Sequence, residues 1–273
     1  MIKRATKRKI VTDNKNKLAL SILVIGFYFI WPQIVGIVKN LFSSASDLVF
    51  EIISNLILIT VLIYIYRKDL KEYLIKFKKD CKKNILTIIA YSLISIVVVG
   101  ILNALVTQFF KINNGTVNDG LLLKDFAKNP FRIGLITIFY YPIVEEIVFE
   151  KTLKDVIPNK CLFIILSGIF FWYYNVAYSA DFTFVAIIGS FYYFVMGVIR
   201  AYTFTKTDNL LVPIFIKAIY NAFVTFMSVG VLMFWEESIH EFTFGRIKHE
   251  FKFMYKYFSD CFSSNCIKSD NFK

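Results

Sequence analysis

Long blocks of apolar residues, separated by short charged stretches, run along most of the chain. About 20 consecutive apolar residues cross the hydrocarbon core of a membrane as a helix, and most blocks approach or exceed that length. Only segments that satisfy their own backbone hydrogen bonds can cross a bilayer, so the blocks predict α-helices. We expect about seven spans, in a range of about six to eight. The blocks are 18–38, 52–66, 84–110, 134–144, 161–180, 182–199 and 210–235.

Composition supports the same fold class. Of the 273 residues, 57% are hydrophobic, and the mean hydropathy is +0.58. A soluble domain of this length does not need so much apolar surface. No small-residue cleavage site follows the first block, so we interpret it as an uncleaved anchor. We therefore predict an all-α integral membrane protein, a bundle of transmembrane helices with no soluble domain.

Basic residues predict the orientation of the bundle. They concentrate in 1–17 and in 67–83, and the net charge of the chain is +12. The positive-inside rule makes both stretches cytoplasmic, so the N-terminus and residues 150–160 are expected inside and the 111–132 loop outside. Because these residues border spans, we expect them to face anionic lipid head groups and not nucleic acid. The excess of Lys, Ile, Asn and Phe is typical of an AT-rich genome, and we expect a bacterial cell membrane.

The chain divides near residue 130. Residues 18–130 contain three spans and the basic stretch 67–83, whose amphipathic pattern predicts a helix along the membrane surface. Residues 131–235 contain four closely spaced spans and nearly all the polar residues that interrupt apolar blocks. Residues 236–273 alternate aromatic with charged residues and form an amphipathic C-terminal tail.

The cysteines predict neither a disulfide framework nor a metal site. Cys81 lies in a charged stretch and Cys161 at the edge of a block, while Cys261 and Cys266 lie in the tail. Their spacing, with His249 twelve residues before the first tail cysteine, fits no zinc pattern.

Polar residues inside the apolar blocks are the candidates for function. An ionisable side chain inside a span costs about 2.5–3.5 kcal/mol on insertion scales and usually faces a cavity or a partner. Four places, one of them an adjacent pair, stand out in the second half of the chain. They are the adjacent pair Glu145 and Glu146, then Asn175, Lys217 and Asn221.

The adjacent glutamates have two interpretations. Side chains of neighbouring helical residues point about 100° apart, so both can face the interior only at the edges of one stripe. One carboxylate could then act as a general base while its neighbour is protonated, because like charges in a low dielectric separate the two pKa values. Alternatively both side chains extend to the membrane interface, which lies close to Lys151.

Lys217 and Asn221 are four residues apart and share one helix face. Lys217 lies at a membrane depth close to that of Glu145, which predicts a neutralising contact between them across the bundle. Asn175, in the stretch "FFWYYNVAYS", also fits a polar residue within an aromatic belt at the outer interface.

Three motifs resemble a known family in order and spacing. "PIVEEIVFE" (142–150) is similar to P-x-x-E-E-x-x-x-R, and "FWYYN" (171–175) falls where the family has F-x-x-x-H. "FVMGVIRAYTFTKTDNLLVPIFIKAIYN" (194–221) is similar to the third region, which ends in H-x-x-x-N. The family is the CPBP intramembrane proteases, which include type II CAAX prenyl endopeptidases and bacteriocin-processing and immunity proteins. The resemblance covers about residues 130–225 and implies a four-helix core.

The resemblance implies roles for the retained positions. Glu145 would be the base that activates water, with Glu146 beside it, and Asn221 would stabilise an oxyanion. In the family, two histidines assist the base or hold a metal. At those positions this chain has Asn175 and Lys217.

These departures weaken the chemistry that the family implies. Neither an amide nor an ammonium group accepts and returns a proton near neutral pH, and neither is a usual zinc ligand, so we expect no cofactor and no zinc. Glu150 stands where the family has arginine. It would repel Glu146 one turn away unless Lys151 or Lys154 compensates.

Three functions remain open at this point. The first is a degenerate, inactive homologue that binds a peptide or a membrane partner, as in bacteriocin immunity or regulation. The second is an active, divergent intramembrane endopeptidase in which Glu145 is the base and Lys217 serves as an acid or an electrostatic clamp. The third is a small transporter or channel that uses the acidic pair as a cation or proton site.

Overall fold

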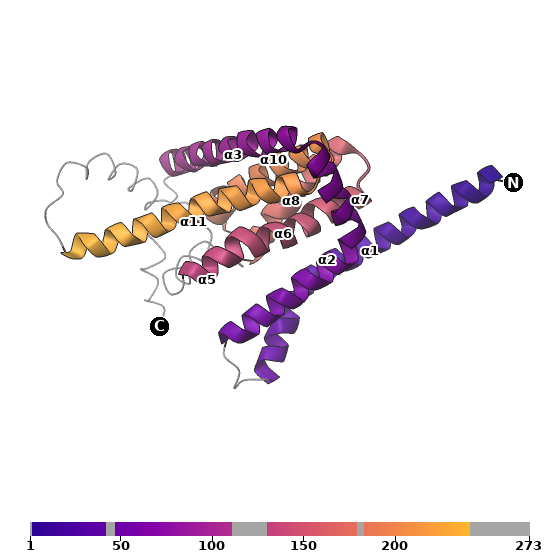
Figure 1. The fold of residues 1–273 in the computed structure, drawn as a ribbon. Helices are drawn as coiled ribbons and strands as arrows, with labels where there is room; N and C mark the ends of the chain where they lie inside the picture. Colours follow the sequence, from indigo (N-terminus) through magenta and orange to yellow (C-terminus); the bar gives the residue numbers. More distant parts are fainter. Residues whose placement is uncertain (1, 42–46, 111–129, 179–182, 241–273) are drawn as a thin grey trace.

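The computed structural model describes residues 2–41, 47–110, 130–178 and 183–240, which form seven helical rods with no strand among them (Figure 1). Each predicted span corresponds to one rod, and the all-α prediction is confirmed. The rods are α1 (Ile2–Leu41), α2 (Asp47–Lys79), α3 (Cys81–Phe110), a central rod, α8 (Lys160–Tyr178), α9 (Phe184–Gly189) with α10 (Phe191–Thr207), and α11 (Leu211–His240). The central rod joins α5 (Pro130–Leu135), η1 (Ile136–Tyr140), α6 (Tyr141–Glu146), η2 (Ile147–Lys151) and α7 (Thr152–Val156).

The outer helices have the length and surface of membrane spans. Within the described residues, four helices are long and apolar enough to cross a bilayer, and two further apolar helices, Lys160–Val176 and Leu211–Met227, are shorter. Large aliphatic side chains on α1, α2 and α3, such as Leu23, Leu56 and Ile101, are exposed. Such contiguous apolar surface indicates contact with lipid. The protein is a multi-pass membrane protein. The four spans are Asn16–Leu41, Val49–Lys79, Cys81–Val106 and Ile187–Thr207.

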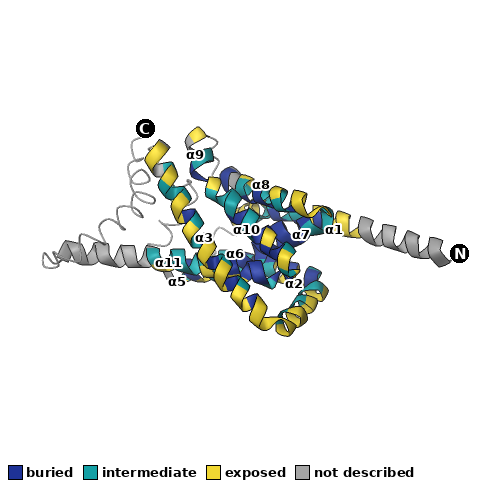
Figure 2. Cartoon of the chain, turned by 90° about the horizontal axis from the view of Figure 1, so that it is seen from above, coloured by how far each residue is buried: buried dark blue, intermediate teal, exposed yellow. Residues whose placement is uncertain are grey.

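The central rod is enclosed by the other helices. Every residue from Val144 to Leu153 is buried, and the middle of the rod is dark blue in Figure 2. Helices α1, α2, α8, α10 and α11 all contact this rod. A helix buried on every side has no lipid face. Glu145 and Glu146 therefore both lie inside the bundle, although they point in different directions.

Two π-helical turns, η1 and η2, lie on either side of α6. A π turn accommodates an extra residue, changes the direction of the side chains that follow, and often occurs at functional sites. The side-chain amide of Asn221 on α11 donates to the carbonyl of Thr137 in η1 over 2.8 Å. The second π turn begins directly after Glu146.

A glycine pair brings α8 and α10 together. A Cβ added to Gly197 would lie 2.7 Å from the Cα of Gly168, and one added to Gly168 would lie 2.9 Å from the carbonyl of Phe194. Both distances are too short for any side chain larger than hydrogen. The two backbones therefore pack directly against each other, and Ser167, next to Gly168, contacts the central rod.

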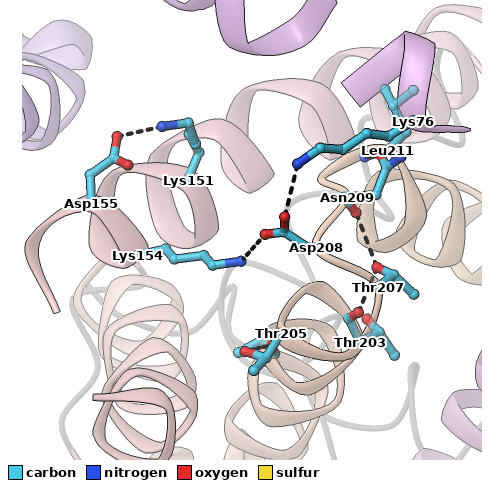
Figure 3. A network of polar contacts seen from close by, with 11 residues as sticks. Lys76, Lys151, Lys154, Asp155, Thr203, Thr205, Thr207, Asp208, Asn209 and Leu211 are labelled. Atoms are coloured by element: carbon cyan, nitrogen blue, oxygen red, sulfur yellow. Dashed lines mark hydrogen bonds and ion pairs between the residues drawn. The ribbon is translucent and has the colours of Figure 1, made fainter. Parts of the chain in front are cut away.

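Polar contacts tie several rods together at one end of the bundle (Figure 3). Asp208, in the turn between α10 and α11, accepts hydrogen bonds from Lys76 of α2 at 2.9 Å and from Lys154 of α7 at 3.0 Å. The next residue, Asn209, donates to the carbonyl of Tyr73 on α2 over 2.9 Å. Its side-chain oxygen also accepts from the backbone of Leu211 at the start of α11.

The helices extend beyond several predicted boundaries. Helix α1 continues into the basic stretch 1–17, and α2 remains helical through most of 67–83, with a turn at Asp80 before α3. The basic stretch is thus part of α2 and α3 and not a helix of its own, and its position along the membrane surface stays a prediction. Residues 111–129 and the tail from 241 lie outside the described residues.

Candidate functional site

The site begins with an ion pair between α11 and the central rod. The Lys217 amine donates a hydrogen bond to Oε2 of Glu145, which is the contact expected from the sequence. The same nitrogen lies 3.5 Å from Oε1 of Glu146. All three side chains are buried, and only 9% of Glu145 is exposed. The interpretation in which the pair extends to the membrane interface is therefore wrong.

The second glutamate has a different cation. Nε of Arg200, on α10, lies 2.7 Å from Oε1 of Glu146, and both side chains are 1% exposed. This is an ion pair by distance, but the N–H does not point along the line to the oxygen, so it is not a well-formed hydrogen bond. Nη2 of Arg200 and Oε2 of Glu146 are likewise buried without a hydrogen-bond partner.

One aromatic ring supports both cations. The guanidinium carbon of Arg200 lies 4.0 Å from the centroid of the Phe171 ring, and the Lys217 amine lies 4.5 Å from the same centroid. Cation–π attraction is stronger when the groups are removed from water, as here. Phe171 also packs edge-on against Phe149 of η2, which joins the ring to the central rod.

Glu150 is completely buried and interacts with α8. The Ser167 hydroxyl lies 2.8 Å from Oε1 of Glu150 and 3.2 Å from the Phe149 carbonyl, whereas Oε2 of Glu150 has no hydrogen-bond partner. Glu146, Arg200 and Lys217 are close enough to interact with it electrostatically.

The lysines expected to compensate Glu150 interact elsewhere. Lys151 pairs with Asp155 at 2.5 Å and with Asp69 at 3.0 Å, and Lys154 pairs with Asp208. Both lysines therefore stabilise contacts between helices at the end of the bundle. The cations close to the acidic residues come instead from α10 and α11.

Neither asparagine bonds to the acidic pair. The Asn175 amide donates to the carbonyl of Phe171 one turn earlier in α8, over 2.8 Å, and only 7% of Asn175 is exposed. This residue therefore faces the bundle and does not belong to an outer aromatic belt. Asn221 donates to the central rod one π turn before the pair.

Arg200 is a site residue that the pattern of apolar blocks does not single out. The block that precedes it ends at Ile199, which places the arginine at the border of a predicted span. A detectable signal was present: the arginine follows Gly197 by about one turn and precedes the Asp208 turn by about two. A cation at that depth needs a partner inside the bundle.

The donor set around the acidic pair does not fit zinc. The Lys217 amine donates a hydrogen bond to Glu145, and the Asn175 amide donates one within its own helix. In the described part of the chain, no group of three or more His, Cys, Asp and Glu side chains is arranged to hold a metal ion.

Comparison with known families identifies the segment that contains this site. Residues 127–223 match the family described as Type II CAAX prenyl endopeptidase Rce1-like. This stretch of the chain is similar to that family, and we call it the Rce1-like segment. The resemblance found in the sequence motifs is confirmed over this range. The Rce1-like segment contains the acidic pair, Glu150, Arg200 and Lys217, whereas α1, α2 and α3 lie outside it.

One curated relative extends beyond the Rce1-like segment. An uncharacterised protein of Mycoplasma capricolum subsp. capricolum is 27% identical over 178 residues, which covers 59% of this chain and 52% of that protein. The chain thus spans about half the length of the relative that it matches. No solved structure matches the chain.

Proposed function

We propose that this protein is an Rce1-like membrane protein that binds a peptide or a membrane-protein partner without cutting it. Bacteriocin immunity or the regulation of a membrane protein are roles of this kind. The proposal depends most on one observation, the buried ion pair between Glu145 and Lys217. The carboxylate that would have to activate water is bound to an amine.

The ion pair opposes general-base catalysis for two reasons. The Lys217 amine donates to Oε2 of Glu145, so this oxygen is already engaged and is not free to accept a proton from water. The base must also pass its proton on, and the positions at which the family has imidazoles contain Asn175 and Lys217, which do not exchange protons near neutral pH. The fold is retained, which suits binding, while the proton path is lost.

The alternative is an active, divergent endopeptidase, and the same contact is its best support. Lys217 is 4% exposed, and a desolvated amine can act as an acid or stabilise developing negative charge. In that mechanism Glu145 remains the base. The two functions differ in whether Glu145 is required for cleavage.

A cleavage assay separates them. The full-length protein and Glu145→Gln are placed in proteoliposomes with a prenylated peptide that ends in a CAAX box, and hydrolysis is followed by mass spectrometry. An Rce1-like enzyme with both motif histidines is the positive control. We expect the wild type and Glu145→Gln to be equally inactive. Hydrolysis by the wild type that is lost in Glu145→Gln contradicts the proposal and supports the endopeptidase.

A further inference from the structure

The arginine that pairs with Glu146 comes from α10 and not from the central rod. Glu146 and Glu150 lie on the same rod, four residues apart, and both are fully buried. A cation at position 150 could reach Glu146 from the same helix. Instead position 150 is acidic, and Nε of Arg200 approaches Glu146 from α10 at 2.7 Å.

The packing of α10 explains how Arg200 reaches the pair. Gly197 lies against Gly168, so α10 approaches α8 at backbone distance at this point. Arg200 follows by about one turn, on the same side of α10, and its guanidinium lies over the Phe171 ring. The neighbouring Ser167 provides the hydroxyl that contacts Glu150. The same helix contact therefore positions both Arg200, which pairs with Glu146, and Ser167, which bonds to Glu150.

The other cations of the region lie closer to carboxylates other than Glu146. Lys217 contacts Glu145 more closely than Glu146. Lys151 pairs with Asp69 and Asp155, and Lys154 with Asp208. Without Arg200, Lys217 would be the nearest cation for both members of the acidic pair.

We propose that Arg200 is a positioning residue that holds Glu146 and thereby leaves Lys217 to pair with Glu145. In this arrangement, the cation for the second glutamate comes from Arg200 on α10 and not from position 150 on the central rod. Position 150 is occupied by Glu150, which accepts a hydrogen bond from Ser167. The proposal concerns how the acidic pair is held, and it stands whether or not the protein cleaves peptides.

If Arg200 supplies the cation for Glu146, a cation placed at position 150 should be able to replace it, and this gives the test. Arg200→Gln leaves Glu146 without its cation in a buried site. We expect it to lower the thermal midpoint of the full-length protein in detergent by at least about 6 °C. Adding Glu150→Arg returns a cation to the central rod and should recover most of the loss. The matched control, R200Q with E150Q, removes the same acidic charge without supplying a cation, and it should recover less.

Infrared difference spectroscopy gives a second measurement that a purely structural role would not affect. In R200Q, Glu146 should take up a proton, so a carbonyl band of a protonated carboxyl should appear. That band should be absent in R200K and in R200Q combined with E146Q. This comparison tests whether Arg200 holds Glu146 even if the double variant R200Q with E150R does not fold. Equal recovery by E150R and E150Q, or a band in R200Q that does not depend on Glu146, overturns the proposal.

Discussion

At the residue scale, the acidic pair is divided between two cations. Glu145 contacts Lys217 of α11, and Glu146 contacts Arg200 of α10. A buried ion pair is weak evidence for net stability, because its attraction mostly offsets the desolvation of both groups. Removing one partner is much more costly, since the other charge stays buried alone. The site therefore constrains the side chains of three helices together.

Asn221 allows a test of its own role. Its amide donates to the Thr137 carbonyl, so Asn221→Ala should reduce stability by about 1 kcal/mol, the usual value of such a bond. Asn221→Asp should reduce it more, because a carboxylate oxygen would face the carbonyl. The thermal midpoints of both variants in detergent measure this. If both variants match the wild type in stability, the hydrogen bond to η1 does not contribute.

At the residue scale, the sequence predicted a contact correctly where the membrane depth of the two residues was enough to decide it. The contact between Lys217 and Glu145 was predicted because the two residues lie at similar membrane depths, and the structure has them in contact. Arg200 was missed because its depth depends on where α10 ends, and that end is defined by the turn at Asp208. The roles of Asn175 and Asn221 as site residues stay predictions.

At the element scale, the close contact between α8 and α10 positions Ser167 and Arg200. Gly197→Ala would place a methyl group 2.7 Å from the Gly168 Cα, which the backbone of α8 can relieve only by moving away. We expect a loss of about 1–3 kcal/mol, as for other overpacked sites.

Gly100→Ala on α3 is the matched control. Nothing lies within 4 Å of a Cβ added at Gly100, so the substitution should be neutral or stabilising by helix propensity. Thermal unfolding of both variants measures the difference. Equal midpoints for the two would mean that the glycine contact does not restrict α10.

The sequence predicted the helical rods but not the π turns within the central rod. Apolar blocks follow directly from the thickness of the membrane, so seven helices could be expected from the pattern. The π turns on either side of α6 could not, because a π turn depends on how neighbouring helices pack and not on local composition.

At the scale of the whole molecule, the turn at Asp208 joins α2, α7 and the last two rods. Burial alone would raise the pKa of Asp208, but hydrogen bonds from Lys76 and Lys154 outweigh burial and lower it. A lowered pKa in the folded state means that the carboxylate stabilises the protein above the ordinary Asp range. This contribution is lost as the pH falls through the lowered pKa.

Asp208→Asn removes the charge and retains a residue that tolerates the positive φ of 48° at this position. Because Asp208 is exposed, we expect the variant to lose about 1 kcal/mol or less near neutral pH. The difference from the wild type should disappear in acid. Thermal midpoints across a pH series measure it, and a difference that does not change with pH would contradict the ion pairs.

The orientation of the bundle can be tested with its own cysteines. Cys81 and Cys161 are both exposed, near stretches that the charge pattern makes cytoplasmic. In single-cysteine variants, with the other cysteines changed to Ser, an impermeant maleimide should label each only after the cells are opened. Asn114→Cys, in the stretch predicted outside, should be labelled in intact cells. Labelling of Cys81 or Cys161 in intact cells would reverse the orientation.

A double-mutant cycle between Glu145 and Lys217 tests the central claim most directly. The free energy of unfolding is measured in mixed micelles for the wild type, Glu145→Gln, Lys217→Met and the double variant. If the amine neutralises the carboxylate, each single change should cost about 3–5 kcal/mol, and the double variant should cost clearly less than their sum. Costs that add to within about 0.5 kcal/mol would show that the two groups do not interact, and would contradict the account.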